Sequence, residues 1–543
     1  MHRRSNAPML ITTLALQGMS HATARAAEPL FVDSGRCIAC HNGISSARGD
    51  DLSFGHSWRP SMMANAARDP YWQAAVRRET LDHPRARAAI EDECSACHMP
   101  MARTQARAGG AKGEIFAHLA ARVRGASAAR LALDGVSCAS CHQIAAARLG
   151  TRESFTGGFV VDTARAPGQR RIFGPYRVER GLQRVMRSAS TFEPARGPHL
   201  RRSEFCATCH TLFTHARGPG GEDLGTLPEQ VPYLEWQHSA YRAKKSCQDC
   251  HMPVEPAEEP IASVLGQPRE HFSRHVFRGG NFFMPRMLNR YRAERGVKAL
   301  PQELQAVARR AVDHLQSRTA RLQIVALRPN ADKLEFEVAV ANLAGHKLPT
   351  AYPSRRAWLH LTVRDGVGRV RFESGAVHDD GGIEGNDNDR DATRFEPHHL
   401  VIERPDQVPI YEAIMVDHAD RVTTGLLRGV RFVKDNRVLP RGFDKASASA
   451  EVAVRGAAIA DGDFIAGGDR VRYHLPLPPG EGPWQIAVEL VYQPIGRRWA
   501  LNLAEVDAVE PRRFVGYYRA MAASSSVVLA RASARWSPRA GAP

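Results

Sequence analysis

Cys94-Ser95-Ala96-Cys97-His98 is one of five stretches in which two cysteines, separated by two residues, are followed directly by a histidine. The ten cysteines of the 543-residue chain all belong to such stretches, and none is left over. The pairs are Cys37/Cys40, Cys94/Cys97, Cys138/Cys141, Cys206/Cys209 and Cys247/Cys250, and the histidines are His41, His98, His142, His210 and His251. Such a set cannot arise by chance, so we take these motifs as the feature that decides the fold of the first half.

The spacing Cys-x-x-Cys-His is typical of covalent attachment of haem c. Two thiols one helical turn apart can form thioethers with the two vinyl groups of one porphyrin, and the histidine that follows can bind the iron as the proximal ligand. Structural zinc would leave the histidine unexplained, and five zinc half-sites do not pair evenly. Disulfides within five Cys-x-x-Cys units would form an unusual framework, even in an exported protein. We therefore expect five covalently bound haem c groups.

The N-terminus has the features of a secretory signal peptide over 1–26. It contains a basic Arg3-Arg4 pair, an apolar run from Met9 to Leu16, and the stretch Ala22-Thr23-Ala24-Arg25-Ala26. The apolar run is too short to span a bilayer. We expect an exported protein, in the periplasm or at the cell surface, that is peripheral to a membrane at most.

The composition, with 43% hydrophobic and 24% charged residues, excludes a largely disordered chain and a polytopic membrane protein. The formal net charge is +17, and removal of 1–26 with Arg3, Arg4 and Arg25 lowers it to +14. The propionates of five haems would lower the charge further to about +4, and five ferric cores would restore it to about +9. Most basic residues are arginines, which suit pairing with carboxylates such as propionates. The charge therefore does not predict a nucleic-acid partner.

The chain divides into two halves of different hydrophobic period. We expect a mainly α, haem-packed domain over 27–290, with one amphipathic helix near 113–123, and a linking helix over 291–320. In the linking helix Pro301 suits the first turn, and the apolar face is formed by Leu304, Val307, Ala308, Ala311, Val312 and Leu315.

From 321 to 535 the period changes to two, which predicts antiparallel strands in a β-sandwich-like domain, followed by a tail over 536–543. A helical insertion is expected near 411–431. The alternating sets are Leu334/Phe336/Val338/Val340, Leu359/Leu361/Val363, Val471/Tyr473/Leu475 and Trp484/Ile486/Val488/Leu490/Tyr492. The predicted fold class is therefore α+β and multidomain.

Each haem that only carries electrons needs a sixth iron ligand, whereas a haem that binds substrate needs an open position. The distal candidates are His56, His118, His215, His275 and His346, and a satisfied core or surface histidine is the alternative at each. Weaker candidates are His199, His238, His271, Met62 and Met63. His346 is distinctive because it lies in a Gly/Pro-framed loop of the β domain and would have to reach a haem across the domain boundary.

The first half resembles the multihaem cytochromes c grouped with the tetrahaem electron acceptor of hydroxylamine oxidoreductase. The matching stretches are His56 with Ser61-Met62-Met63-Ala64, Cys94 to Pro100, Glu235-Trp236 with Ser239, and Cys247 to Pro253. His275 to Gly280 and Gly345 to Thr350 are similar to segments of larger members with a C-terminal β domain. The resemblance implies mostly bis-histidine haems packed closely for electron transfer, and it favours His56, His275 and His346 as distal ligands.

Two departures from this family limit the comparison. Five haems exceed the tetrahaem member, and the β domain has no counterpart there. The pentahaem nitrite reductases have the same haem count, but their substrate haem has lysine in place of the motif histidine, whereas all five motifs here end in histidine.

We therefore predict an exported electron carrier that works between redox partner proteins, or between a quinol-side donor and an acceptor. The alternative is a multihaem oxidoreductase with one open iron, acting on a small nitrogen or sulfur compound. A separate acidic run, Asp379-Asp380 with Asp387, Asp389 and Asp391, is either a calcium site or a solvated loop.

Overall fold

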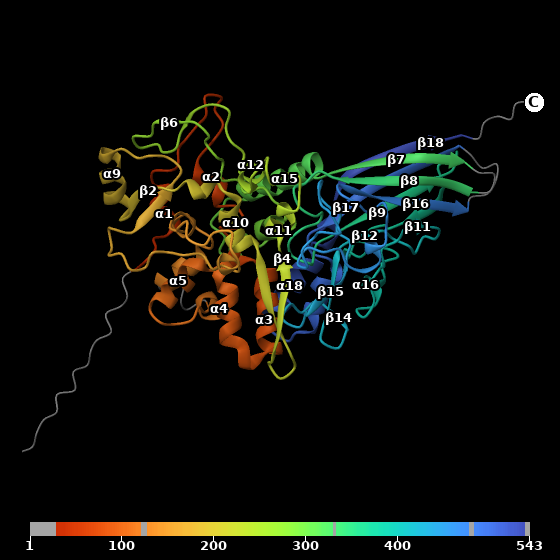
Figure 1. The fold of residues 1–543 in the computed structure, drawn as a ribbon, viewed down its shortest axis with the longest axis horizontal. Coiled ribbons are helices and arrows are strands. Elements are labelled where there is room, and N and C mark those ends of the chain that lie inside the picture. The colour runs from red at the N-terminus through yellow and green to blue at the C-terminus, as the bar shows by residue number, and fades with distance from the viewer. Residues whose placement is uncertain (1–28, 121–126, 330–332, 477–482, 538–543) are drawn as a thin grey trace, which may run out of the picture.

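The computed structural model describes residues 29–120, 127–329, 333–476 and 483–537. A helical half contains the five motifs, and a second half consists mainly of strands (Figure 1). The predicted signal peptide over 1–26 lies outside the described residues, as does most of the predicted tail over 536–543. Within the described residues, no helix combines the length and apolar character needed to cross a bilayer.

Each Cys-x-x-Cys-His motif lies on or beside a short helix. The first begins on α1 and continues into the turn that follows, whereas the other four end α4, α8, α10 and α12 at their histidines. Because two residues separate the cysteines, one helical turn places both thiols on the same side of each of these four helices. The bounds are α1 Ser34–Ile38, α4 Arg87–His98, α8 Cys138–His142, α10 Ser203–His210 and α12 Cys247–His251.

The first motif departs from this pattern at Cys40. The helix α1 ends at Ile38 and Cys40 lies in the turn beyond it, but the His41 backbone N–H still donates to the Cys37 carbonyl at 3.1 Å, the spacing of an α-helix, so the two cysteines are about one helical turn apart. The Cys40 backbone N–H donates to the Cys37 carbonyl at 3.2 Å, a bond between residues three apart that is tighter than that of an α-helix. The Cys40 carbonyl is drawn away from helical pairing, since it accepts hydrogen bonds from the backbone N–H of Ser263 at 2.9 Å and from its hydroxyl at 3.1 Å.

The remaining elements of the helical half are short and joined by long loops. The expected helix over 113–123 is only the four-residue α6, and 121–126 lies outside the described residues. The other helices are α2 Phe54–Trp58, α3 Pro70–Asp82, α5 Pro100–Ala108, α7 Ser127–Leu133, α9 Arg180–Ser190, α11 Pro232–Gln237, α13 Phe283–Arg290 and α14 Arg292–Arg295, with α6 at Phe116–Leu119. Three strand pairs accompany them: β1 Arg171–Gly174 with β2 Glu193–Arg196, β3 Leu212–Arg217 with β4 Asp223–Gln230, and β5 Glu259–Pro260 with β6 Pro268–Arg269.

The predicted helix that begins at Pro301 is α15, Pro301–Arg318. Its N-terminus is closed by Glu303, whose carboxylate accepts the backbone N–H of Leu300 at 2.8 Å and also binds the Arg59 guanidinium. Its buried face includes Leu304, Ala308, Ala311 and Leu315, and β7 starts directly after it at Ala320.

The second half is built on two larger sheets. One has the order β10-β9-β17-β18, with β12 also paired to β9, and the other has the order β11-β16-β8-β7. The first comprises β9 Arg356–Arg364, β10 Val370–Ser374, β12 Ile410–Tyr411, β17 Trp484–Gln493 and β18 Val527–Trp536; the second comprises β7 Ala320–Pro329, β8 Lys333–Asn342, β11 Val401–Ile402 and β16 Gly468–Pro476. All pairings in these sheets are antiparallel except β11 with β16.

The alternating residues predicted from the sequence point inward from both sheets into one apolar core. Phe336 and Tyr473 illustrate the register, since they are paired across β8 and β16 and their rings stack with centroids 5.0 Å apart. Leu361 on β9 and Val488 on β17 are fully buried in the same core. The predicted α+β multidomain fold is confirmed.

The expected helical insertion near 411–431 is wrong. This segment forms strands of a third sheet, with the order β14-β13-β15: β13 Ala413–Val416, β14 Val422–Thr423 and β15 Arg431–Asp435. All four residues of β13 are buried, so the strand shows no alternation of apolar and polar residues. A continuous apolar run of this kind is compatible with a buried strand as well as with a buried helix.

The acidic run favours arginine partners over calcium. Asp380 forms an ion pair with Arg497 at 2.9 Å, and Asp389 forms one with the buried Arg356 at 2.9 Å. Asp389 lies on the short helix α16, Asp387–Arg390, and Arg497 begins the short helix α17, Arg497–Leu501. Carboxylates already bound to guanidinium groups are poor ligands for a further cation. These ion pairs favour the structural role of the two carboxylates, and the calcium interpretation stays a prediction.

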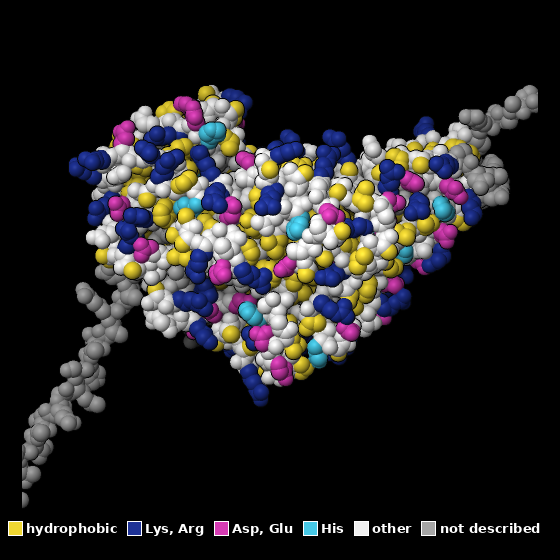
Figure 2. All heavy atoms as spheres, in the orientation of Figure 1, with side chains coloured by type: hydrophobic (Ala, Val, Ile, Leu, Met, Phe, Trp, Pro, Cys, Tyr) yellow, Lys and Arg dark blue, Asp and Glu magenta, His cyan; other side chains and the backbone are white. Residues whose placement is uncertain are grey.

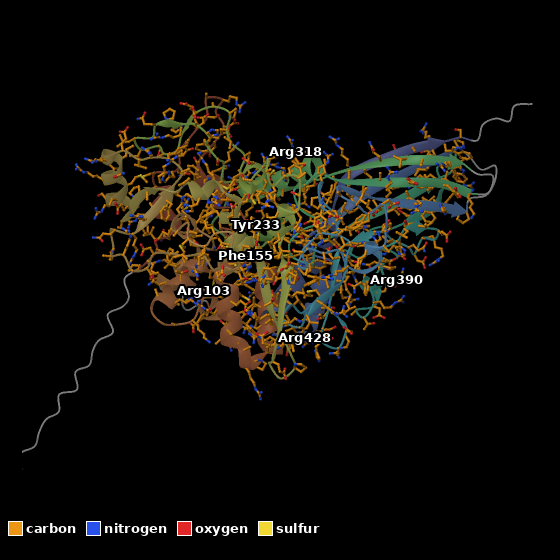
Figure 3. The ribbon with its side chains drawn as sticks, in the orientation of Figure 1. Arg103, Phe155, Tyr233, Arg318, Arg390 and Arg428 are labelled. Atoms are coloured by element: carbon orange, nitrogen blue, oxygen red, sulfur yellow. The ribbon has the colours of Figure 1, made fainter. Side chains whose placement is uncertain are left out.

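The two halves are joined by side chains as well as by the chain. The helix α18, Val509–Arg519, packs on α3, where Arg77 forms two hydrogen bonds of 2.9 and 3.0 Å with Glu510. The rings of Tyr71 and Phe514 pack beside this pair with centroids 5.0 Å apart. Phe155 and Tyr233 lie near the middle of the molecule, with ring centroids 6.0 Å apart (Figure 3).

Candidate redox site

The five motifs are numbered 1 to 5 in chain order, and their thiols are close to one another. All ten cysteines are free thiols. Thiols of different motifs are near enough to shift one another's pKa: Cys138 of motif 3 lowers that of Cys37 of motif 1, Cys97 of motif 2 raises that of Cys209 of motif 4, and Cys247 of motif 5 raises that of Cys206 of motif 4. Cys141 of motif 3 is near enough to Cys206 and Cys209 to raise the pKa of both. The fold therefore brings all five motifs into one connected cluster, with motif 4 in contact with two others.

Three further thiols complete the pairs, and their surroundings differ. Cys94 of motif 2 lies on α4, where desolvation raises its pKa well above the ordinary value. Cys250 of motif 5 is exposed on α12, and Cys40 of motif 1 is half-buried in the turn after α1. The second thiol of the first motif lies in the turn that follows α1. Thioether formation at all ten cysteines stays a prediction.

Four of the five motif histidines are oriented by a backbone carbonyl. Their Nδ1–H groups donate over 2.5 to 3.0 Å, and the pairs are His41 with Ile261, His98 with Ala66, His142 with Phe173 and His251 with Arg278. A carbonyl can only accept, so each ring carries its proton on Nδ1 and keeps the Nε2 lone pair available. This is the arrangement that fixes the tautomer of a metal-bound histidine. The fifth histidine, His210, ends α10.

The surrounding protein favours the neutral form of four motif histidines, His98, His142, His210 and His251. Desolvation lowers the pKa of His98 and of His251 to about 4, and it also lowers the pKa of His142 and of His210. The indole of Trp72 stacks on the His98 ring with centroids 4.2 Å apart and planes within 4°. Neutral imidazole is the form that can donate a lone pair to iron.

Two of the predicted distal histidines face motif histidines. The ring centroids of His142 and His275 are 6.3 Å apart with an interplanar angle of 15°, and those of His251 and His346 are 6.4 Å apart with an angle of 20°. Metal–imidazole bonds are about 2.0 Å long and each nitrogen lies about 1.1 Å from its ring centre, so two imidazoles on opposite sides of one metal have centroids about 6.2 Å apart. His275 and His346 also donate Nδ1–H to carbonyls, those of Ser273 and Lys347, each at 3.0 Å.

The other three distal candidates have no such neighbour. Among the described residues, no ring contact joins His56, His118 or His215 to a motif histidine. His56 Nδ1 lies 3.5 Å from Glu303, and His215 Nδ1 lies 3.3 Å from Glu93. Ligation by these three histidines stays a prediction.

A buried network of charges holds the His346 loop against the helical half. Glu235 of α11 accepts the Lys347 backbone N–H at 3.1 Å and forms an ion pair of 2.8 Å with Arg437. Asp435 binds both Lys347 Nζ and Arg437 at 2.7 Å. All four side chains are buried, and Lys347 is fully so. The loop that carries His346 is thus held by Glu235 of the helical half and by Asp435 and Arg437 of the β half.

Sequence reasoning missed His314, which lies on α15. Its ring centroid is 6.4 Å from that of His251, with an interplanar angle of 53°, and its buried Nδ1 has no hydrogen-bond partner. The signal was present, because His314 shares a helix face with Val307 and Ala311 at spacings of seven and three residues. The carbonyl acceptors were also missed, since any residue type supplies a carbonyl.

The ligand set fits haem c. The motifs offer free thiols in pairs, four of their histidines have the Nδ1 tautomer, and two of these face a second imidazole at the distance that one intervening iron requires. Haem bound there would supply the redox chemistry, and the residues named would attach and orient it.

No family model matches the chain, and neither does any curated protein. Among solved structures, the chain is similar to a penta-haem cytochrome c552 from Thermochromatium tepidum, with a TM-score of 0.52 and 16% sequence identity. The match covers 94% of this chain and 100% of that chain. The chain shares the fold of a multihaem cytochrome. At this identity the likeness concerns the fold alone, and five Cys-x-x-Cys pairs are consistent with five haem sites.

Proposed function

We propose that the protein is a periplasmic penta-haem c-type cytochrome that carries electrons between redox partners, either proteins or a quinol-side donor. Each motif attaches one haem c through its two cysteines and supplies its histidine as the proximal ligand. His275 completes the iron site of motif 3, and His346 completes that of motif 5.

The observation that carries this proposal is the pair of facing imidazoles, His142 with His275 and His251 with His346. An iron with two strong nitrogen ligands is low-spin and has no open position for a substrate. Such a centre changes little in geometry on reduction, which favours rapid electron transfer over bond-making chemistry.

The contacts between thiols support transfer within the molecule. A thioether fixes the edge of a porphyrin, so motifs with neighbouring thiols would hold porphyrin edges near one another. Motif 1 has a thiol near motif 3, and motif 4 has thiols near motifs 2 and 5. Motif 3 is linked to motif 4 through Cys141, which lies near both thiols of motif 4. An electron that enters at any haem therefore has a route to the other four.

The first test is haem content and spin state. Mass spectrometry and pyridine haemochrome analysis of the mature protein should give five covalent haems per chain. Electron paramagnetic resonance of the oxidised protein should then show low-spin ferric signals. A high-spin component in the untreated protein would instead favour the oxidoreductase with one open iron.

The second test concerns the ligand from the β half. His346→Ala should convert one haem to the high-spin state and leave four unchanged, because it removes one axial nitrogen. His314→Ala is the matched control, since His314 lies at the same distance from His251. Conversion by His314→Ala, with none by His346→Ala, would assign the ligand to α15 and overturn the assignment of His346.

A further inference from the structure

An arginine-lined cavity of about 650 Å³ lies on the helical half, where four separate segments meet. Its basic lining residues are Arg177 after β1, Arg196 at the end of β2, Arg201 before α10 and Arg269 at the end of β6. Glu258, Glu270 and His271 also contribute to the wall. Lysine and arginine side chains gather on this part of the surface, around α9 and β6 (Figure 2).

The cavity has a built framework at Tyr176. The Tyr176 hydroxyl donates to the carbonyls of Glu270 at 2.9 Å and His271 at 3.1 Å, which ties the loop after β1 to the loop after β6. The guanidinium groups of Arg201 and Arg269 lie 5.2 and 5.9 Å from the centre of the Tyr176 ring. Cation–π contacts at these distances hold the two positive charges over the Tyr176 ring, which forms part of the cavity wall.

The four guanidinium groups are not neutralised by the protein. Among the described residues, none of Arg177, Arg196, Arg201 and Arg269 forms a salt bridge. The neighbour Arg202, in contrast, pairs with Glu204 at 3.2 Å. Four like charges around one cavity, with only two carboxylates in its wall, repel one another and favour an anion between them.

The cavity lining is close along the chain to residues at the facing pair His142 and His275. Phe173, whose carbonyl orients His142, is three residues before Tyr176, and His275 is four residues after His271. Tyr176 therefore joins the segment whose Phe173 carbonyl accepts from His142 to the segment that carries His275. A negative charge bound in the cavity would act on the potential of an iron held between these rings.

We propose that this cavity binds an oxyanion, with the arginines as charge-assisted hydrogen-bond donors. Two sources supply this chemistry: a small dissolved oxyanion, or a propionate of a haem attached nearby. Guanidinium suits both, because its planar fork can donate two parallel hydrogen bonds to one carboxylate or oxyanion. The proposed anion site does not depend on the proposed electron-carrier function. The expected effect of a bound anion on the reduction potential of a haem does depend on it.

Two measurements on the full-length holoprotein separate the sources, with sodium sulfate as the probe and sodium chloride of equal ionic strength as the reference. The first cavity variant is the double substitution Arg201→Gln/Arg269→Gln, which removes the two positive charges that lie over the Tyr176 ring. The second is Arg196→Gln, which leaves the contacts of Tyr176 intact. Arg184→Gln on α9 is the matched control, because Arg184 is exposed and does not line the cavity. Calorimetry reports sulfate binding whether or not haem is present, and spectroelectrochemistry reports the five potentials.

If the anion is dissolved, sulfate binds saturably and lowers one potential, and the cavity variants weaken binding about tenfold or more, as loss of a charged hydrogen bond predicts. If the anion is a propionate, sulfate has no effect, but the cavity variants lower one potential in its absence. The proposal is overturned if both cavity variants match Arg184→Gln in both measurements. Sulfate binding without any shift in potential would support the anion site while removing its link to the iron between His142 and His275.

Discussion

Asp435→Asn tests the charge network that fixes the His346 loop. The Asp435 carboxylate accepts hydrogen bonds from Lys347 Nζ at 2.7 Å and from two Arg437 nitrogens at 2.9 and 2.7 Å. These two cations hold the pKa of Asp435 well below its usual range, although the group is buried. Asparagine keeps the shape of the side chain and removes its charge.

The expected loss of stability is large. In the wild-type protein Lys347 and Arg437 face Asp435 and Glu235, so the buried charges balance. The variant leaves one buried cation without a counter-charge, and breaking a buried pair in this way costs about 3–5 kcal/mol. Lys347 is fully buried and cannot turn toward water to recover its hydration.

Urea unfolding followed by far-ultraviolet circular dichroism measures this loss, and the visible spectrum reports the spin state of the haems. Asp420→Asn is the matched control, because Asp420 is 74% exposed and pairs with Arg431 on the surface. Its cost should be about 0–1 kcal/mol. A loss of less than about 1 kcal/mol for Asp435→Asn, equal to that of the control, would refute the reasoning.

Three further predictions concern the core, a buried carboxyl and a ligand. Leu361→Ala should destabilise the β half by about 2–5 kcal/mol in the same urea assay, whereas Val367→Ala, at a position 76% exposed, should change stability by less than about 0.5 kcal/mol. Burial raises the pKa of Asp469 to about 7, so its contribution to stability is present at low pH and is lost as the pH rises through 7. Thermal unfolding between pH 5 and 8 should therefore be less pH-dependent in Asp469→Asn, and an unchanged dependence would contradict the shift. His275→Ala should make one haem high-spin by electron paramagnetic resonance, while His378→Ala at an exposed site should leave the spectrum unaltered.

The parts of the fold that were predictable are those with a strong local pattern. The five motifs set the chemistry of the first half, and the alternation along β8, β9, β16 and β17 predicted one apolar core between two sheets. β13 lacked that alternation because both of its faces are buried, so the sequence pattern could not separate strand from helix. The helix expected over 113–123 shortened to α6, where the backbone N–H groups of Ile115 and Phe116 donate to the Glu91 carboxylate.

The spacing of the candidate site identified its cysteines and motif histidines, but it did not reveal contacts such as that of the Cys40 carbonyl with the Ser263 hydroxyl, 223 positions away. Spacing identifies cysteines and the histidine beside them, but the partner of His142 lies 133 positions further along, at His275. Such a pairing depends on the tertiary fold. Glu235 and Arg437, which come from different halves, are likewise brought together only by folding, and no local pattern distinguishes them.

The carbonyl acceptors behind the motif histidines have a consequence for how such a chain can diverge. Ala66, Phe173, Ile261 and Arg278 orient imidazoles with main-chain oxygens, so replacing any of these side chains leaves the acceptor in place. The orientation of these motif histidines then depends on the path of the backbone and not on the identity of the four residues that supply the carbonyls. Substitutions at these four positions would therefore leave the imidazole tautomers unchanged, provided that the backbone path is kept.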